Sequence, residues 1–216
     1  MKKILVVFVT LLTFSVSAQR GNNDSNRIGI SGGLTQMNLF TNNLSVTPEN
    51  GWIGGFSVRG NYYNDWQMSF GMFFTDSNFS VPTFGLSGVK ELSYKLSAVQ
   101  IYLLPSYVIS ENHLNFEFGP VLQVNGKLAI DKTRENDVLV DQPNLIAKDI
   151  TDVTKINANI YVGINGGLKN FRARIGYQYG LTNLFGNLRN NDNVQLTREK
   201  FKANLGLISA QFTVYL

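Results

Sequence analysis

Between residues 156 and 184 the chain holds two runs in which apolar residues alternate strictly with polar or small ones, separated by a short turn at 166–170. A period of two is the side-chain period of a β-strand, so the two runs predict a β-hairpin. Each run is close to the roughly 9–11 residues that a tilted transmembrane strand needs. The apolar faces comprise Ile156, Ala158, Ile160, Val162 and Ile164 in the first run and Phe171, Ala173, Ile175, Tyr177 and Tyr179 in the second.

The opposite face of this hairpin distinguishes a membrane barrel from a secreted β-sandwich. Gly163, Gly176 and Gly180 all fall on that face. Glycine is depleted from ordinary solvated strands, whereas the crowded interior of a small barrel favours it. Arg172 and Arg174 share the face, and an arginine turned toward lipid would cost about 2–4 kcal/mol near the bilayer midplane. We therefore expect these glycines and arginines to face a barrel lumen.

The N-terminus has the features of a secretory signal peptide. Lys2 and Lys3 precede an apolar run at 4–14, and small residues at 16–18 offer a cleavage site before Gln19. We expect a signal peptide at 1–18 and a single outer-membrane β-barrel domain at 19–216. No other stretch approaches the roughly 18 consecutive apolar residues of a membrane helix. A membrane protein with this sequence would therefore cross with strands, in the outer membrane of a Gram-negative bacterium.

Six further strands are predicted from the same alternation. They cover 27–40, 52–62, 66–75, 92–109, 114–125 with alternation continuing to 130, and a last strand that ends at Leu216. Pro105 would forfeit a ladder hydrogen bond, so a β-bulge is expected there, and the phase of that strand stays open. A second bulge is expected near Gly206, because the apolar residues before and after it have opposite parity.

The connections between these strands alternate in length. Short connections are predicted at 63–65, 110–113 and 166–170, and long ones at 41–51, 76–91, 131–155 and 182–199. Bacterial barrels keep short turns on the periplasmic side and long loops outside. The pattern predicts an all-β fold, an eight-stranded antiparallel up-and-down transmembrane β-barrel whose N- and C-termini are periplasmic.

The charged, histidine and cysteine residues of the chain bear on which functions such a barrel could have. The chain has 19 Lys and Arg against 15 Asp and Glu, and removal of residues 1–18, with two lysines, would leave a net charge of +2 without a basic cluster. Nucleic acid is therefore not expected as a partner. The one histidine, His113, falls in a predicted turn, and there is no cysteine. We expect no enzyme activity and no cofactor or metal, and we interpret Asp149 and Asp152 as solvated charges rather than calcium ligands.

Four charged residues are expected to meet inside the barrel. They are Arg59, Glu117, Arg172 and Arg174, all on predicted inward faces, and Arg174 is expected to pair with Glu117. Eight strands enclose a lumen just wide enough for its own side chains, so a structural plug is the favoured interpretation. A narrow ion path is the alternative.

The longest predicted loop, at 131–155, is the candidate for partner contact. Long connections in compact domains are commonly functional or disordered. This loop is not purely polar, and its apolar residues could form a small hairpin that offers them to a partner within a rim of mixed charge. The alternative is a mobile, solvated loop without a partner. The candidate contact residues are Val138, Leu139, Val140, Leu145 and Ile146.

Three segments of the second half of the chain resemble the PorT-like outer-membrane β-barrel family. They are Gly176, Tyr177, Tyr179, Gly180, Leu181, Thr182 and Asn183; Phe118, Gly119 and Pro120; and Val99, Gln100, Ile101, Leu103, Leu104 and Tyr107. The chain departs from the family pattern at Gln100 and Tyr102, where an acidic residue and a proline are usual, and at Leu216, where an aromatic residue is commoner. The resemblance implies a small, signal-bearing barrel, and the namesake of the family is associated with the type IX secretion system.

These observations favour a structural, binding or assembly module of the cell envelope, with a link to protein secretion that the resemblance implies. Its partners would be outer-membrane lipid and an envelope or secretion-complex protein. An outer-membrane enzyme and a narrow transporter for small solutes are the alternatives. The enzyme interpretation lacks a histidine placed for catalysis, and the transporter interpretation conflicts with a filled lumen.

Overall fold

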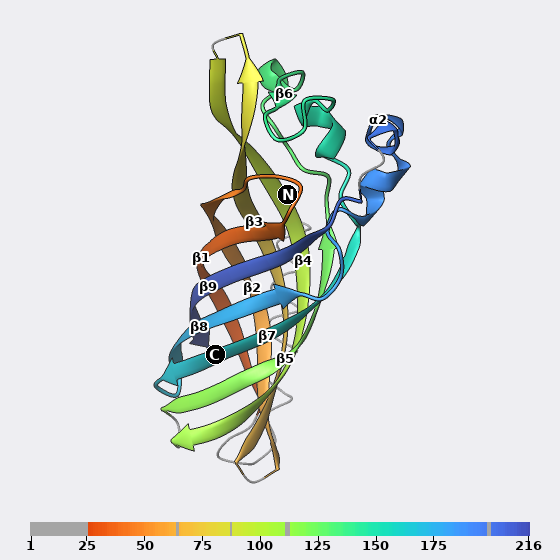
Figure 1. The fold of residues 1–216 in the computed structure, drawn as a ribbon. Coiled ribbons are helices and arrows are strands. Elements are labelled where there is room, and N and C mark those ends of the chain that lie inside the picture. Colours follow the sequence, from red (N-terminus) through yellow and green to blue (C-terminus); the bar gives the residue numbers. More distant parts are fainter. Residues whose placement is uncertain (1–25, 64, 87, 111–112, 198–199) are drawn as a thin grey trace, which may run out of the picture.

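The computed structural model describes residues 26–63, 65–86, 88–110, 113–197 and 200–216. The predicted signal peptide at 1–18 lies outside the described residues. Eight long strands make up most of the fold, and Figure 1 shows how they are arranged. They are β1 (Arg27–Thr41), β2 (Thr47–Tyr63), β3 (Trp66–Gly85), β4 (Gly88–Ser110), β5 (Leu114–Asn125), β7 (Ile156–Gly167), β8 (Phe171–Gly180) and β9 (Ala203–Tyr215).

The eight strands form a closed antiparallel ring. Each strand pairs with the next one along the chain, and β1 pairs with β9 to close the barrel. The short strand β6 (Val138–Leu139) pairs with β3 outside the ring. The predicted eight-stranded up-and-down barrel is thus confirmed. Closure leaves the ring without a free strand edge, which is the condition for burying a sheet in lipid.

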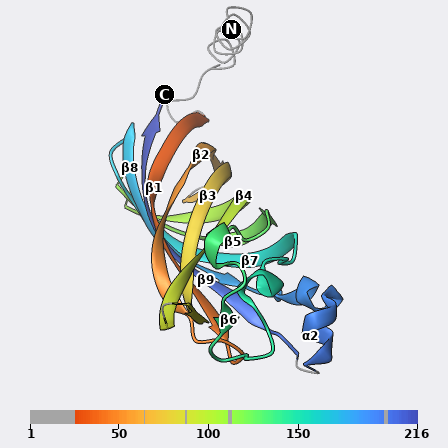
Figure 2. The same cartoon turned by 90° about the horizontal axis from the view of Figure 1, so that it is seen from above.

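The remaining elements lie in the long connections. They are the 3₁₀-helices η1 (Lys132–Arg134), η2 (Ala147–Ile150) and η3 (Gly186–Asn190) and the short helix α2 (Asp192–Leu196). None of the helices within the described ranges has the length and apolar character needed to cross a membrane. Figure 2 shows these elements gathered over the same end of the strands.

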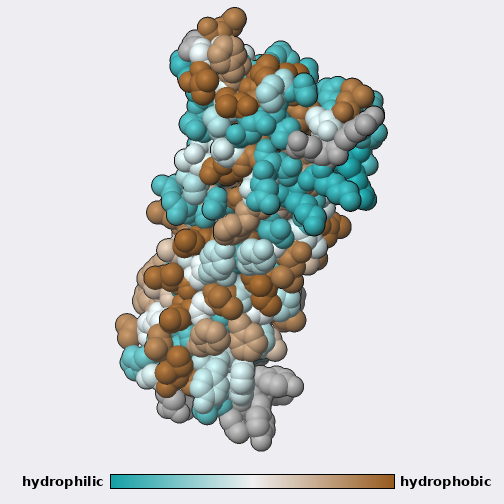
Figure 3. All heavy atoms as spheres, in the orientation of Figure 1, coloured by the Kyte–Doolittle hydropathy of each residue, from teal (hydrophilic) through white to brown (hydrophobic). Residues whose placement is uncertain are grey.

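The strand faces follow the predicted parity. Ile160, Val162 and Ile164 on β7 and Ile175 on β8 are exposed on the outer wall, while their sequence neighbours are buried or half-buried. The phase of β4, left open by the sequence, is now fixed, because its buried side chains are the even-numbered ones from Leu92 to Ser106. Figure 3 shows brown, hydrophobic side chains over the lower part of the outer wall, below a band of teal, hydrophilic ones.

The two ends of the barrel differ, and two of the four connections predicted to be long are long. The connections β2–β3, β4–β5 and β7–β8 are short and lie at one end, called here the turn end. Arg27 and the C-terminus also lie there, and the Leu216 N–H donates to the Ile28 carbonyl at 2.9 Å. The opposite end, called here the loop end, carries the connections that hold β6, η1, η2, η3 and α2.

The prediction of a long connection at 76–91 is wrong. Strands β3 and β4 continue through it in unbroken register from Asp76↔Ser97 to Gly85↔Gly88, as a hairpin that projects beyond the other loops (Figure 1). The outer face becomes polar after Phe74, with Asp76 and Asn78, so the lipid-facing pattern ends although the strand does not. For the same reason β2 begins at Thr47 rather than at 52, which shortens the predicted loop at 41–51.

Both predicted bulges are absent. Across Pro105 the β3–β4 register is continuous, and the β4–β5 register is the same on the two sides of the proline, although no pairs form between Tyr102↔Val121 and Ser106↔Glu117. The β4–β5 ladder shifts its register farther on, between Val108 and Ser110. The register of β9 with β1 and β8 is continuous through Gly206. The change of parity near Gly206 has another cause, since the inward positions of β9 turn from polar to apolar toward the loop end.

Strand β5 ends at Asn125, and the alternation up to Ile130 does not continue it. Gly126, Leu128 and Ala129 run beside β4 instead, joined to it by an isolated bridge between Lys95 and Ala129. The sequence pattern persists there because Leu128 is buried beneath the loops.

Candidate functional site: the filled lumen and its cap

The lumen near the turn end contains the predicted charged cluster. Arg174 forms an ion pair with Glu117, with 2.7 Å between Nε and Oε2, and both side chains are at most 2% exposed. The Asn165 side chain donates to Glu117 Oε1 at 2.8 Å. Arg172, which is 1% exposed, donates to Asn165 Oδ1 at 3.0 Å and to Asn115 Oδ1 at 2.8 Å. The structure therefore brings three of the four predicted residues into one network.

The fourth residue, Arg59, is buried on β2. Its guanidinium lies 4.9 Å from the centre of the Tyr215 ring, a distance suited to a cation–π contact. This contact holds Arg59, and the hydrogen bonds to Asn115 and Asn165 hold Arg172. Buried charge of this kind is costly unless it is paired or hydrogen-bonded, and here every arginine of the cluster has polar or aromatic contacts.

An apolar and aromatic layer lies above the charged cluster. It comprises Ile53, Phe73, Tyr102, Leu104, Val121 and Tyr161. The Tyr102 ring lies 4.9 Å from Phe73 and 5.7 Å from Tyr161, centre to centre. Tyr161 passes over Gly163 and Gly176, where an added Cβ would fall within 2.4 Å of its hydroxyl oxygen. The inward glycines therefore make room for a tyrosine that fills the lumen.

A layer of amide side chains follows toward the loop end. Gln100, Asn159 and Gln178 all donate to Gln123 Oε1 at 2.9–3.1 Å, although they belong to β4, β7 and β8. The Gln123 amide in turn donates to Asn125 Oδ1 at 2.7 Å. This layer was not predicted from the sequence, because the phase of β4 was open and amide side chains carry no charge that would mark them as a cluster.

An apolar core closes the lumen at the loop end. Inward residues of the barrel wall and buried residues of the long loops form one continuous cluster of 22 side chains. It includes Leu139, Leu145 and Ala147 from the loop at 131–155 and Phe185, Leu188 and Val194 from the connection between β8 and β9. The loops that form this core are called here the cap.

The structure places the five predicted contact residues differently from one another. Leu139 and Leu145 are fully buried in the cap, Val138 and Ile146 are half-buried, and only Val140 is exposed. The small hairpin expected there exists in part, as a bridge between Val138 and Ile146. Most of the apolar surface of this loop therefore stabilises the cap and is not available to a partner.

The cap loops are also joined by polar contacts. Asp149, only 5% exposed, accepts hydrogen bonds from the Ile146 N–H at 3.0 Å and from the Asn193 side chain at 3.0 Å. The Asn191 side chain donates to the Asp149 carbonyl at 3.1 Å. Asp149 thus connects the loop at 131–155 to helix α2. The expectation that it is a solvated charge is wrong, because the neighbouring loop covers it.

Two sequence predictions concern His113 and metal binding. His113 lies in the connection between β4 and β5 at the turn end, the end of the barrel opposite the cap. Its backbone N–H donates to the Ser110 carbonyl. Within the described ranges no three His, Asp or Glu side chains are grouped so as to hold a metal ion.

A closed antiparallel ring of eight strands, with an apolar outer wall and a side-chain-filled lumen, defines the class of small outer-membrane β-barrels. A crystal structure of Ail, the attachment invasion locus protein of Yersinia pestis, bound to the heparin analogue sucrose octasulfate has a similar fold. The two chains are 11% identical with a TM-score of 0.50, over 89% of this chain and 99% of that one.

The outer membrane protein OprG of Pseudomonas aeruginosa is also similar, at 10% identity and a TM-score of 0.47, over 89% of this chain and 97% of OprG. No protein-family model matches the chain, and no curated protein sequence does.

Proposed function

We propose that this chain is a non-conducting barrel of the Gram-negative outer membrane that holds the cap outside the cell as a binding or assembly platform. The observation that carries this proposal is the filling of the lumen by successive layers. A charged network, an aromatic layer, an amide layer and an apolar core occupy the inward positions from the turn end to the loop end.

The cap supports the platform part of this proposal. A loop that served only to connect strands would not need a shared core, and ordering a long loop costs conformational entropy. Here two long connections bury 22 side chains together with the barrel wall and exchange hydrogen bonds through Asp149. Surface loops held by a rigid scaffold are frequent sites of recognition. The turn end would face the periplasm, as in other bacterial barrels with short periplasmic turns.

Electrical recording tests the closed lumen. The purified barrel in a planar lipid bilayer is expected to give no discrete current steps under applied voltage. Steady, reproducible channel openings would favour the alternative of a narrow small-solute transporter. An epitope inserted beside Val140, which is exposed in the cap, tests the orientation: antibody should label intact cells if the loop end is external.

The resemblance to PorT-like barrels favours a finer version, in which the platform seats part of a protein secretion complex. Gentle detergent extraction of the chain from its own outer membranes, followed by mass spectrometry of bound proteins, tests it. Recovery of secretion components with the wild-type chain, but not with a chain whose residues 138–147 are replaced by a Gly/Ser linker, would support this version.

A further inference from the structure

The end of the β3–β4 hairpin carries a group of exposed apolar side chains, called here the tip. Its members are Phe84, Leu86 and Val89, which are 59%, 110% and 61% exposed. Phe84 and Val89 are cross-strand partners, and Leu86 lies in the reversal between Gly85 and Gly88, where Gly88 has a φ of 87°. Figure 3 shows hydrophobic side chains at the extreme upper end of the molecule, where this hairpin ends.

The tip lies far from the membrane that holds the barrel. Phe74 and Val99 are the last apolar pair on the outer wall, and polar residues follow, including Asp76 and Lys95. The eleven steps along β3 from Phe74 to Gly85 span about 36 Å at about 3.3 Å per residue. A band of hydrophilic surface separates the tip from the hydrophobic outer wall (Figure 3). The tip therefore lies apart from the hydrophobic outer wall of its own barrel.

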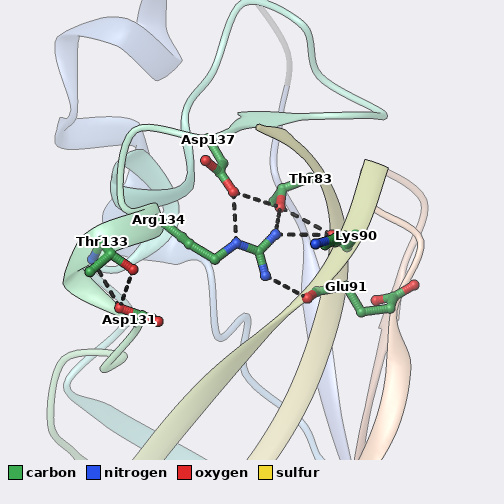
Figure 4. Close-up of polar contacts among 7 residues, drawn as sticks. All are labelled: Thr83, Lys90, Glu91, Asp131, Thr133, Arg134 and Asp137. Carbon is green, nitrogen blue, oxygen red and sulfur yellow. Dashed lines mark hydrogen bonds and ion pairs between the residues drawn. The ribbon is translucent and has the colours of Figure 1, made fainter. Parts of the chain in front are cut away.

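The hairpin is held upright by a brace centred on Arg134 (Figure 4). The Arg134 guanidinium donates to the Glu91 carbonyl at 2.8 Å, to Thr83 Oγ1 at 2.8 Å and to the Lys90 carbonyl at 3.3 Å. It also forms an ion pair with Asp137 at 2.9 Å. One side chain of the cap thus contacts both strands of the hairpin, just below the tip.

Further contacts fix the same stretch. Strand β6 pairs with β3 at Thr83 and Phe84, and the Val140 N–H donates to the Pro82 carbonyl at 3.1 Å. Asp131 begins η1 by accepting hydrogen bonds from the N–H and hydroxyl of Thr133, which hold the pKa of its carboxyl below the usual value. A two-stranded ribbon alone is marginally stable, so these contacts explain how a long hairpin keeps apolar residues at its end.

The charges near the tip balance. Lys90 and Glu91 are adjacent, Arg134 pairs with Asp137, and Lys95 pairs with Asp76 at 2.8 Å. The β3–β4 hairpin therefore has no excess charge with which to attract a polyanion or an anionic lipid surface. Any binding by the tip would have to come from burial of its apolar side chains.

The residue types at the tip favour lipid over a protein pocket. Energetic anchors of protein interfaces are enriched in Trp, Tyr and Arg, whereas Leu and Val are under-represented among them. The three described members of the tip are Phe, Leu and Val, whose side chains have no hydrogen-bonding group, and a fluid bilayer accepts exposed apolar side chains without a preformed pocket. We propose that the tip inserts into the surface of a second lipid bilayer that faces the loop end. This proposal requires only that the barrel sits in a membrane, not that the cap binds a protein.

A single-cysteine variant tests the proposal directly, because the chain has no cysteine. Leu86→Cys is labelled with an environment-sensitive fluorophore, and the barrel is held in a lipid disc bounded by scaffold protein. Zwitterionic phosphatidylcholine vesicles are then added. The emission should shift to shorter wavelength, and brominated lipid in the vesicles should quench it. The response should not change when anionic lipid is added to the vesicles. It should also be the same at about 0.05 and about 0.5 M NaCl, because the β3–β4 hairpin has no excess charge.

Leu196→Cys provides the matched control, since Leu196 is a strongly exposed leucine on helix α2 of the cap. Its label should not respond to vesicles.

In flotation of the unlabelled barrel, Phe84→Ser is expected to lower the vesicle-bound fraction about tenfold, as the loss of one partly buried apolar side chain predicts. A Leu86 label that vesicles leave unchanged would overturn the proposal and favour a protein pocket as the site that receives the tip. Current steps in the planar bilayer test, by contrast, would bear only on the closed lumen.

Discussion

At the scale of single residues, the lumen depends on pairs that cannot be replaced one at a time. The clearest is Arg174 with Glu117, since the ion pair is almost completely buried. Removing one partner leaves a charge in a site that water cannot reach, whereas removing both leaves neutral groups.

Arg174→Leu is therefore expected to destabilise the barrel by about 3–5 kcal/mol, and the double variant Arg174→Leu with Glu117→Gln by less. Thermal unfolding in detergent, followed by circular dichroism, measures both. Lys95→Leu is the control, because Lys95 and Asp76 form an exposed pair that should contribute about 0–1 kcal/mol. Equal melting temperatures for wild type and Arg174→Leu would contradict the assignment.

Gly176 leaves space in the lumen for the Tyr161 side chain. An added Cβ would lie 2.1 Å from the hydroxyl oxygen of Tyr161, which is packed against Tyr102 in the lumen. Gly176→Ala is expected to displace that ring and to lower stability by about 1–3 kcal/mol, as overpacked cores do. Gly32→Ala, on the outer wall with nothing within 4 Å of the added Cβ, should have little effect. If both variants melted like the wild type, the Tyr161 ring would not be fixed over the glycine.

At the scale of elements, the cap behaves as a small core laid over the barrel. Leu145→Ala is expected to loosen it, because burying a leucine fully contributes about 2–5 kcal/mol with its cavity term. Limited proteolysis of the loop at 131–155 should then become faster, while the gel mobility of the folded barrel stays unchanged. Val140→Ala, at an exposed position of the same loop, is the control. Equal cleavage rates for the two variants would count against a packed cap.

The projecting hairpin is the second element with a defined support. Arg134→Met keeps much of the side-chain length but removes the donors to both strands and the ion pair with Asp137. Proteolytic cleavage between Gly85 and Gly88 should increase clearly. Lys148→Met, an exposed cap residue whose side chain donates to Asn136, should leave cleavage unchanged. Protection that persisted in Arg134→Met would assign the support to β6 alone.

At the scale of the whole molecule, closure of the ring dominates the expected behaviour. Because β1 pairs with β9, no strand edge is available at which the sheet can begin to open. The folded barrel is therefore expected to resist SDS at room temperature and to migrate differently on a gel after boiling. A single mobility before and after boiling would be incompatible with a closed barrel, as would a helical circular dichroism spectrum.

The sequence alone predicted the barrel because a bilayer imposes a simple rule on every strand. Outward residues must be apolar and inward residues must fit a narrow lumen. Alternation therefore predicted eight strands, the faces of all of them except β4, and the inward position of Arg59, Glu117, Arg172 and Arg174. The signal peptide at 1–18, the secretion link and a partner for the cap remain predictions.

Only the tertiary structure decided what happens beyond the membrane. There the lipid rule ends, so Asp76 and Asn78 face outward on β3 while Phe79 and Val81 turn inward, and a pattern that indicated a loop is a strand. Likewise Phe201 and Leu205 suggested a bulge because their parity was judged against lipid, whereas they face the apolar core of the cap. Which side of a strand is buried depends there on loops distant in sequence, and local alternation cannot identify those partners.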